Sequence, residues 1–332
     1  MRKAKIAGVG HYVPAKVITN ADLEKIIETS NEWIIERTGI EERRYFEEGK
    51  DTTANMGAQA ACMALEMAGL EASQLDMIVF ATLSPDYTFP GSGVLLQREL
   101  GLNEIPALDV RNQCSGFIYA LSVADQFIKT GMYNHVLVVG SEIHSSGLDM
   151  TTRGRAVSVI FGDGAGAVVL SPSEGEDQGI LSTHLHAQGE FAEELAAIDP
   201  GSIKDPRLTK EMIDEGTIYP YMNGSTVFKH AVTRFPEVIM EALQHNRLQP
   251  SDIDMLIPHQ ANLRITSFIQ QKMGLPAEKV YSNIQRYGNT TAASVPLALS
   301  EAVQEGKIKK GDLVCLAAFG SGFTWASALV RW

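Results

Sequence analysis

A long internal duplication constrains the fold of this chain more than any other feature of its sequence. Residues 73–79 (SQLDMIV) reappear as residues 251–257 (SDIDMLI), an offset of 251 − 73 = 178 positions. Further matches follow in the same order, first a helical segment and then a glycine turn leading into an apolar strand, at residues 96–102 and 269–275 and at residues 161–170 and 319–330. Ordinary repeat arrays have periods of roughly 20–50 residues. A single copy of this length therefore indicates two similar halves of one protein.

Each half alternates helical and apolar strand patterns. Helical patterns at residues 56–68 and 227–243 precede apolar strands at residues 77–82 and 255–257. Alternating helices and buried strands predict an α/β fold with mostly parallel strands and both sheet faces covered. We expect the halves to pack about a pseudo-twofold axis, which brings equivalent strand ends to one central place. Ligands of such sheets bind outside the carboxyl ends of the strands.

Composition and charge exclude several classes of protein. The 332 residues are 45% hydrophobic, enough for a large core, and we divide the chain into halves at residues 1–172 and 173–332. The net charge of −12 argues against a nucleic-acid partner. The apolar runs are far too short to span a bilayer, and the three dispersed cysteines have no metal-ligand spacing. Because the N-terminal residues lack an apolar signal stretch, we expect a cytoplasmic protein with reduced thiols and no metal cofactor.

Cys114 lies where an apolar strand pattern, residues 107–110, gives way to a helical one. The helix is predicted from apolar residues at i, i+4, i+7 and i+11, namely Phe117, Leu121, Ala124 and Ile128. A helix N-terminus offers backbone N–H donors and a partial positive charge, which predict a lowered thiol pKa and a nucleophilic thiolate. Cys62 and Cys315 fit the commoner role of a small buried hydrophobe. The position of Cys114 by itself fits either role.

Two polar residues in the second half are candidate partners for this cysteine. His259 follows the predicted strand at residues 255–257. Asn289 lies in the second-half counterpart of the Cys114 region, since 289 − 114 = 175 is close to the repeat offset. The duplication therefore predicts that Cys114, His259 and Asn289 meet at the axis, as a nucleophile with two hydrogen-bonding partners.

This constellation fits two reactions. One is acyl transfer through a thioester, with His259 and Asn289 donating hydrogen bonds to an oxygen that becomes negative. The other is papain-like hydrolysis, in which the histidine deprotonates the cysteine and the asparagine orients the histidine. The spacing 259 − 114 = 145 is compatible with that class. The papain nucleophile, however, lies near the mature N-terminus in a different local motif, so we reject the protease.

Several motifs together carry a resemblance to a known family. In the first half they are residues 29–33 (TSNEW), 37–40 (RTGI), 109–117 (DVRNQCSGF) and 153–154 (RG), which leads into 161–167 (FGDGAGA). In the second half they are residues 258–264 (PHQANLR), 287–294 (YGNTTAAS) and 323–332 (FTWASALVRW). Over essentially its whole length the chain resembles β-ketoacyl-acyl-carrier-protein synthase III, a family of thiolase-superfamily condensing enzymes. The resemblance implies a thiolase-like α/β fold whose two duplicated halves form five layers, αβαβα.

The resemblance also implies a reaction that initiates fatty acid synthesis. Cys114 takes the acyl group of an acyl-CoA, and malonyl-acyl carrier protein then binds and loses CO₂. His259 and Asn289 stabilise the enolate, which attacks the acyl group. The backbone N–H groups of Cys114 and Ser321 form a second oxyanion hole, at a position where many relatives have glycine in place of Ser321.

Binding residues are implied by the same match. Trp33 and Arg153 are expected to hold the CoA adenine between them, with Thr29 and Arg37 nearby.

The family resemblance further implies partners. It implies a homodimer in which Phe89 closes the acyl pocket of the partner chain. Acyl carrier protein is acidic, so its docking needs a local basic patch, for which the candidates are Arg264, Lys229 and Lys272.

Two departures from the family pattern lie near the expected entrance. Residues 184–222 are longer and more acidic than the resemblance implies, and Ser225 stands where relatives often carry asparagine. Because of these two departures, the sequence does not determine which acyl-CoA is the primer. The alternative function is a related condensing enzyme that makes a secondary metabolite or joins longer acyl chains.

Overall fold

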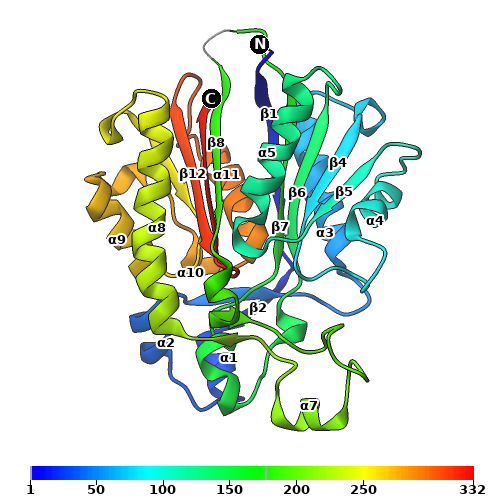
Figure 1. Cartoon of the computed structure of the whole chain (residues 1–332), viewed down its shortest axis with the longest axis vertical. Coiled ribbons are helices and arrows are strands. Elements are labelled where there is room, and N and C mark those ends of the chain that lie inside the picture. The colour runs from blue at the N-terminus through cyan, green and yellow to red at the C-terminus, as the bar shows by residue number, and fades with distance from the viewer. Residues whose placement is uncertain (1, 176–177) are drawn as a thin grey trace.

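The computed structural model describes residues 2–175 and 178–332, and two β-sheets organise it (Figure 1). The first sheet has the order β1-β7-β6-β4-β5, with β1 (Ala4–Tyr12), β4 (Met77–Ala81), β5 (Ala107–Val110), β6 (Val136–Glu142) and β7 (Gly164–Pro172). The second has the order β11-β12-β13-β8, with β8 (Gly179–Ala187), β11 (Met255–Pro258), β12 (Leu313–Gly320) and β13 (Thr324–Arg331). Two small ribbons pair β2 (Lys16–Thr19) with β3 (Glu42–Tyr45) and β9 (Leu195–Ala196) with β10 (Tyr221–Met222).

Helices cover both faces of both sheets, so the five-layer arrangement is confirmed. Between the sheets lie α5 (Gly116–Lys129) and α11 (Ser294–Gln304), whose apolar side chains join a core built from both sheets. On the outer face of the first sheet lie α3 (Thr53–Ala68) and α4 (Ser92–Glu99); on that of the second lie α8 (Gly224–His245) and α9 (Leu263–Met273). The shorter helices are α1 (Asn20–Glu24), α2 (Asn31–Thr38), α6 (Arg155–Ser158), α7 (Lys210–Glu215) and α10 (Ile284–Tyr287). No helix of the described residues is both long and apolar enough to cross a membrane.

The duplication is visible element by element. β4 and β11 begin 178 residues apart, at Met77 and Met255, and so do α5 and α11, at Gly116 and Ser294. The same register pairs the 3₁₀ turn before α5 (Gln113–Ser115) with the one before α11 (Thr291–Ala293). The residue equivalent to Cys114 is therefore Ala292, and Asn289 precedes that turn.

The expectation of mostly parallel strands is wrong, because both sheets are mixed. β4 pairs in parallel with β5 and β6, and β11 with β12. The pairings of β7 with β1 and β6, and of β13 with β12 and β8, are antiparallel. Residues 321–323 alone separate β12 from β13, and so short a loop can join only antiparallel neighbours.

The predicted helix after Cys114 is confirmed as α5. Its four periodic residues, Phe117, Leu121, Ala124 and Ile128, are all fully buried between the sheets. Gly131, just past the helix end, adopts φ +75°, a conformation that suits glycine. This buried helix holds the turn that carries Cys114 in a fixed position.

Candidate active site

The three predicted residues line one cavity, two of them directly after strands and one after a helix. Cys114 lies in the turn after β5, His259 directly follows β11, and Asn289 lies between α10 and the turn before α11. All three line a cavity of about 560 Å³, which we call the triad cavity. Residues from distant parts of the sequence thus meet at the axis.

Cys114 is packed more tightly than its sequence position indicates. Its exposed fraction is 5%, and a Cβ on Gly320 would lie 2.5 Å from its Cβ and 2.8 Å from its sulfur. Only glycine fits at position 320. The backbone groups of Ser321 and of Cys114 itself lower the pKa of the thiol, in opposition to the effect of burial.

The expectation of a lowered thiol pKa is wrong for this state. Burial, with a smaller contribution from the charge of Glu142, raises the pKa of Cys114 to about 12, and the two backbone hydrogen bonds only partly oppose it. Desolvation outweighs the helix N-terminus because the sulfur lies under the β12–β13 loop. The resting cysteine is therefore a thiol, and its proton must leave during acylation.

His259 is neutral and has one ring nitrogen unpaired. Burial lowers its pKa to about 3. Nδ1 lies 2.5 Å from the Ser294 hydroxyl, which fixes the ring, while buried Nε2 has no hydrogen-bond partner in the described part of the chain. An unsatisfied buried nitrogen next to a thiol is available to a substrate or to a proton in transit.

Asn289 is held by its backbone and by the oxygen of its side chain. Its N–H donates to the carbonyl of Ile160 (2.9 Å), and its carbonyl accepts from Gly162 (3.0 Å). Its Oδ1 accepts from the Thr291 backbone N–H (2.9 Å), so the NH₂ group is left to donate elsewhere.

These contacts distinguish the two reactions considered above. In a papain-like triad the asparagine orients the histidine. Here the partner of His259 is Ser294, and Asn289 is anchored to Thr291. The arrangement is a nucleophile with two separate neutral donors, which suits a thioester oxygen that becomes negative. Within residues 2–175 and 178–332, no group of three or more His, Cys, Asp or Glu side chains could hold a metal ion.

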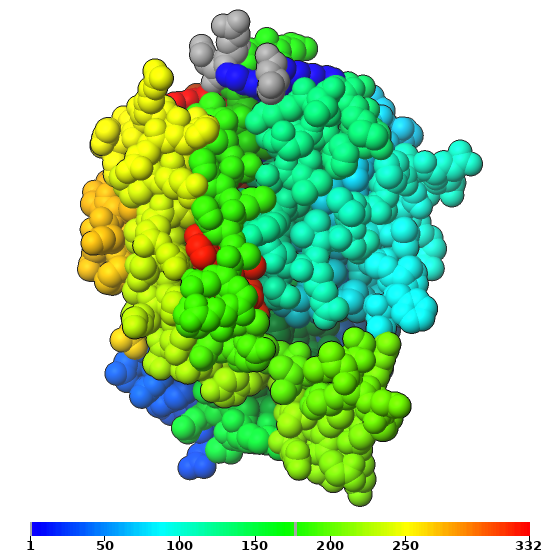
Figure 2. All heavy atoms as spheres, in the orientation of Figure 1, coloured from blue at the N-terminus to red at the C-terminus, as the bar shows by residue number. Residues whose placement is uncertain are grey.

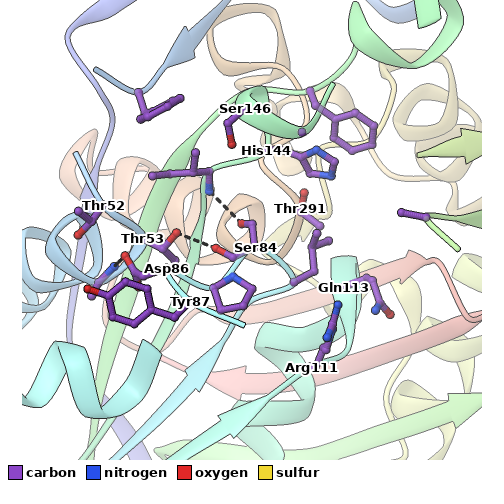
Figure 3. A pocket seen from close by; sticks show the side chains of 18 of the residues that line it. Thr52, Thr53, Ser84, Asp86, Tyr87, Arg111, Gln113, His144, Ser146 and Thr291 are labelled. Carbon is purple, nitrogen blue, oxygen red and sulfur yellow. Dashed lines mark hydrogen bonds between the residues drawn. The ribbon is translucent and has the colours of Figure 1, made fainter. Parts of the chain in front are cut away.

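A second cavity begins on the other side of the nucleophile. It has a volume of about 680 Å³, and Figure 3 shows its labelled lining, which includes Thr53, Tyr87 and His144. We call it the far cavity. Cys114, Phe161 and Leu195 line both cavities, so the sulfur lies at the junction between them.

Comparison with known proteins identifies the family. Two family models of 3-oxoacyl-acyl-carrier-protein synthase III match the chain, the general model at residues 108–189 and its C-terminal model at residues 243–332. The β-ketoacyl-acyl-carrier-protein synthase III of Salmonella arizonae is 49% identical over 98% of this chain and 99% of its own. The chain belongs to the β-ketoacyl-acyl-carrier-protein synthase III family. It is an acyltransferase of the thiolase-like fold.

Solved structures agree with this assignment. The 3-oxoacyl-acyl-carrier-protein synthase III of Aquifex aeolicus superposes with a TM-score of 0.91 at 44% identity, covering 99% of this chain and all of that one. A priming β-ketosynthase of a polyketide pathway superposes with a TM-score of 0.90 at 32% identity, covering 99% of this chain and 96% of that one.

The residues expected to bind CoA in this synthase III chain are only partly brought together. Trp33 and Arg37 line the triad cavity, and the Arg37 guanidinium carbon lies 4.5 Å from the Trp33 ring centre. The expectation that Trp33 and Arg153 hold the CoA adenine between them stays a prediction. Arg153 binds the Asp149 carboxylate (2.6 Å), four residues before it, and the Asp214 carbonyl (3.1 Å).

Arg155, two residues further along the chain, contacts the Trp33 ring. Its guanidinium carbon lies 4.9 Å from the Trp33 ring centre, and it donates to the Glu28 carbonyl (2.8 Å). Thr29, just before α2, has a buried hydroxyl without a hydrogen-bond partner among the described residues. The motif TTRGR contains two arginines, and the sequence could not tell which of them would reach the ring.

The expected carrier-protein residues lie on α8 and α9. Arg264 lines the triad cavity, with its guanidinium 5.9 Å from the Phe228 ring centre. Lys229 is exposed beside Phe228, and Lys272 is exposed in the last turn of α9. Ser225, at the start of α8, also lines this cavity. Arg264 is thus the basic residue of the three that adjoins the path to Cys114.

Of the remaining expected features, residues 184–222 line the far cavity of their own chain and Phe89 does not. Phe89 is 82% exposed and does not line the far cavity of its own chain. The segment 184–222 contributes Leu195, Ile218 and Pro220 to the lining. Figure 2 shows the yellow-green surface of its later part projecting below the rest of the molecule.

Sequence reasoning missed Glu142, at the end of β6. Its carboxylate accepts hydrogen bonds from Thr82 (2.9 Å), from Ser84 and from the backbone N–H of Leu83, and burial raises its pKa to about 7. It also lies within 3.4 Å of the Ala292 backbone nitrogen. The signal was available, because a carboxylate ends the apolar run VLVVGSE and the repeat offset pairs it with Gly320 (320 − 142 = 178).

Proposed function

We propose that this protein condenses an acyl-CoA primer with malonyl-acyl carrier protein, giving 3-oxoacyl-acyl carrier protein, CoA and CO₂, as the first condensation of fatty acid synthesis. The observation that carries the proposal is the position of Cys114 at the junction of two cavities, with His259 and Asn289 in one of them. The triad cavity is the route for the pantetheine arm, and the far cavity receives the acyl chain.

In the first half-reaction the Cys114 sulfur attacks the thioester carbon. The new S–C bond forms, the C–S bond to CoA breaks, and the thiol proton ends on the CoA sulfur. Because burial keeps the resting cysteine protonated, this proton needs a carrier. The unpaired Nε2 of His259 fits this role in the tautomer that carries the hydrogen on Nδ1, where the Ser294 hydroxyl accepts it; the tautomer with the hydrogen on Nε2 is the donor in the next half-reaction.

In the second half-reaction malonyl-acyl carrier protein occupies the triad cavity. His259 and Asn289 donate to its thioester oxygen, the C–C bond to the carboxylate breaks, and CO₂ leaves. The enolate carbon then attacks the acyl carbon on Cys114, so that a C–C bond forms and the acyl C–S bond to Cys114 breaks; the released thiolate takes up a proton from solvent and is a thiol again. The backbone N–H groups of Cys114 and Ser321 stabilise the oxyanion of that step.

The test is a reconstituted condensation. Purified protein, acetyl-CoA and malonyl-acyl carrier protein should yield 3-oxobutyryl-acyl carrier protein, detected by intact mass, together with one CO₂ per product. Branched and longer acyl-CoAs, tested in parallel, define the primer range. Acylation of Cys114 without any carrier-bound product would contradict the proposal.

A second candidate is the priming of a secondary metabolite or the joining of longer acyl chains. It is favoured by the far cavity, to which residues 184–222 add a wall, and by the 32% identity to a polyketide priming β-ketosynthase. Condensation with long acyl-CoAs but none with acetyl-CoA would favour this candidate.

We further propose that the protein is a cytoplasmic homodimer. Each chain consists of two halves, residues 1–172 and 173–332, and the two chains join along the β5 edge. Among the residues that the structure describes, β5 pairs only with β4, and Tyr87, Phe89 and Leu108 are exposed near it. A bare edge strand beside exposed large hydrophobic residues is suited to a partner chain. Phe89 would then reach the far cavity of the partner.

Phe89→Ala is expected to admit longer primers. Removing the ring enlarges the partner's far cavity, so the ratio of octanoyl-CoA to acetyl-CoA acylation of Cys114 should rise by about 10-fold, the effect of a few methylene groups. Intact mass gives this ratio, and light scattering at micromolar concentration gives the oligomeric state. Thr88→Ala, on the same loop but outside the far cavity lining, is the matched control. A fully active monomer would contradict the assignment.

Trp33→Ala is expected to weaken acyl-CoA binding. Loss of the indole should raise KM for acetyl-CoA by about 3- to 10-fold, because ring stacking and cation–π contacts are lost. KM for malonyl-acyl carrier protein should not change. Arg155→Ala and Arg153→Ala, measured side by side, show which arginine assists, and the contacts in the structure favour Arg155. Equal KM changes for both substrates would refute a nucleotide site at Trp33.

We also propose that Arg264, Lys229 and Lys272 contact the acidic carrier protein. The protein itself carries a net charge of −12, so this docking depends on a local basic patch. Arg264 is the member that adjoins the triad cavity.

A further inference from the structure

The far cavity has a polar corner that a hydrocarbon chain does not need. His144, after β6, and Thr291, in the turn before α11, both line it, and Figure 3 shows the Thr291 hydroxyl on the side of the His144 ring. Neither residue has a role in the two half-reactions above.

His144 is buried, and its ring lies flat on Phe161. The ring centroids are 4.0 Å apart with an angle of 13° between the planes, and the exposed fraction of the residue is 9%. The backbone N–H of His144 donates to the Asp163 carboxylate (2.7 Å), which fixes the residue from behind. Within the described chain, no other residue hydrogen-bonds the ring. Burial lowers the pKa of His144 to about 4, so the ring is neutral at pH 7 and carries one donor and one acceptor.

Thr291 offers a buried polar group without a partner beside the His144 ring. Its exposed fraction is 1%, and its hydroxyl has no hydrogen-bond partner in the described part of the chain. The residue adopts φ +52°, which is strained for a β-branched side chain, and its backbone N–H is held by Asn289. The fold therefore fixes this hydroxyl where nothing in the chain satisfies it.

The corner lies close to the nucleophile. Phe161, which carries the His144 ring on its face, lines both cavities beside Cys114. An acyl chain attached to Cys114 and directed away from the triad cavity enters past Phe161, so its first carbons meet this corner.

We propose that the far cavity is built for an acyl group that carries an uncharged oxygen, a hydroxyl or a carbonyl, which hydrogen-bonds Thr291 and His144. This inference rests on the proposed function. A plain hydrocarbon chain would leave the Thr291 hydroxyl buried and unpaired and would not hydrogen-bond the His144 ring, and a site built around such groups discriminates against a substrate that lacks the matching oxygen.

The oxygen is uncharged because the two groups of this corner, the His144 ring and the Thr291 hydroxyl, are neutral; Arg98 and Arg111 are the cations that line the far cavity. The His144 ring is neutral, and Glu142 lies close enough for its charge to raise the pKa of Cys114. A carboxylate on the acyl chain would face that charge in a desolvated site.

The experiment measures competition among primers of equal length. The full-length protein is mixed with equimolar butyryl-CoA and 3-hydroxybutyryl-CoA, and separately with butyryl-CoA and 4-hydroxybutyryl-CoA. The two hydroxy isomers place the oxygen at different depths. Intact mass at short times gives the ratio of the two adducts on Cys114. We expect at least one hydroxyacyl group to be favoured by about 10- to 100-fold, the size of one or two buried hydrogen bonds.

Two variants locate the effect. His144→Leu and Thr291→Val each remove one polar group with little change of volume, and each should reduce the preference by about 10-fold. Since both adducts form in one tube, a general loss of activity or folding cancels from the ratio. His135→Leu is the matched control, because His135 pairs with Ser171 and lines neither cavity.

The outcomes separate cleanly. If butyryl-CoA labels Cys114 as fast as both hydroxy isomers, the inference fails and the proposed function stands. A preference that survives in both variants would also overturn it. Failure of the proposed function looks different, since then no acyl-CoA labels Cys114 and both proposals fall.

Discussion

Replacing Cys114 with alanine is expected to abolish acylation of the protein by acyl-CoA. The sulfur lies at the junction of both cavities, with backbone donors directed at it, and no other group in the triad cavity can form a thioester. Nucleophile removal should lower turnover by at least about 10³-fold. Intact mass after incubation with acetyl-CoA measures the adduct directly.

The other two cysteines provide the controls. Cys62 is exposed on α3, and Cys315 is buried in β12, where burial raises the pKa of its thiol to about 12. Cys62→Ala and Cys315→Ala should both keep the adduct. A stable acyl group on Cys62 or Cys315, with none on Cys114, would overturn the site.

His259→Ala and Asn289→Ala are expected to lose most release of CO₂ from malonyl-acyl carrier protein. The enolate depends on donors placed where its charge develops, and loss of one such donor costs about 10²–10³ in rate. Acylation of Cys114 should remain measurable in both. His259→Ala should slow it more, because the thiol of Cys114 must give up its proton. Radiolabelled malonyl-carrier decarboxylation and intact mass follow the two steps separately.

Asn289→Asp is the matched control for the asparagine. The aspartate keeps the oxygen that accepts from Thr291 but cannot donate to the thioester, so it should be as inactive in decarboxylation as alanine while the local structure is retained. If acylation collapsed in both alanine variants while decarboxylation survived, the assigned roles would be reversed.

Much of the fold could be predicted because the duplication and the hydrophobic pattern report the same elements. The stripe from Phe117 to Ile128 is the buried face of α5, and the apolar runs at Met77 and Met255 are β4 and β11. The meeting of Cys114, His259 and Asn289 was predicted from the repeat offset, because equivalent segments of the two halves meet at the axis.

The remaining features depend on tertiary contacts. The antiparallel direction of β13 was not predicted, because an apolar strand has the same sequence pattern in either direction. The thiol pKa was predicted in the wrong direction because local sequence shows the helix N-terminus but not the loop at Gly320 that buries the sulfur. The contact of Arg155 with Trp33 was not predicted, because the sequence cannot show which arginine of TTRGR lies over the indole ring.

Gly320 and Glu142 end equivalent strands, and their difference makes a symmetric scaffold work asymmetrically. At one end the missing side chain leaves space for the sulfur of Cys114. At the other, the carboxylate of Glu142 cross-links the β4 loop and lies against Ala292, which has no reactive atom. The duplication gives the fold two equivalent positions for a reaction centre. Gly320 leaves one of them free for the reactive cysteine, and Glu142 makes the other rigid. Each chain therefore carries one acyl group at a time. The equivalent strand end of its other half keeps the site rigid.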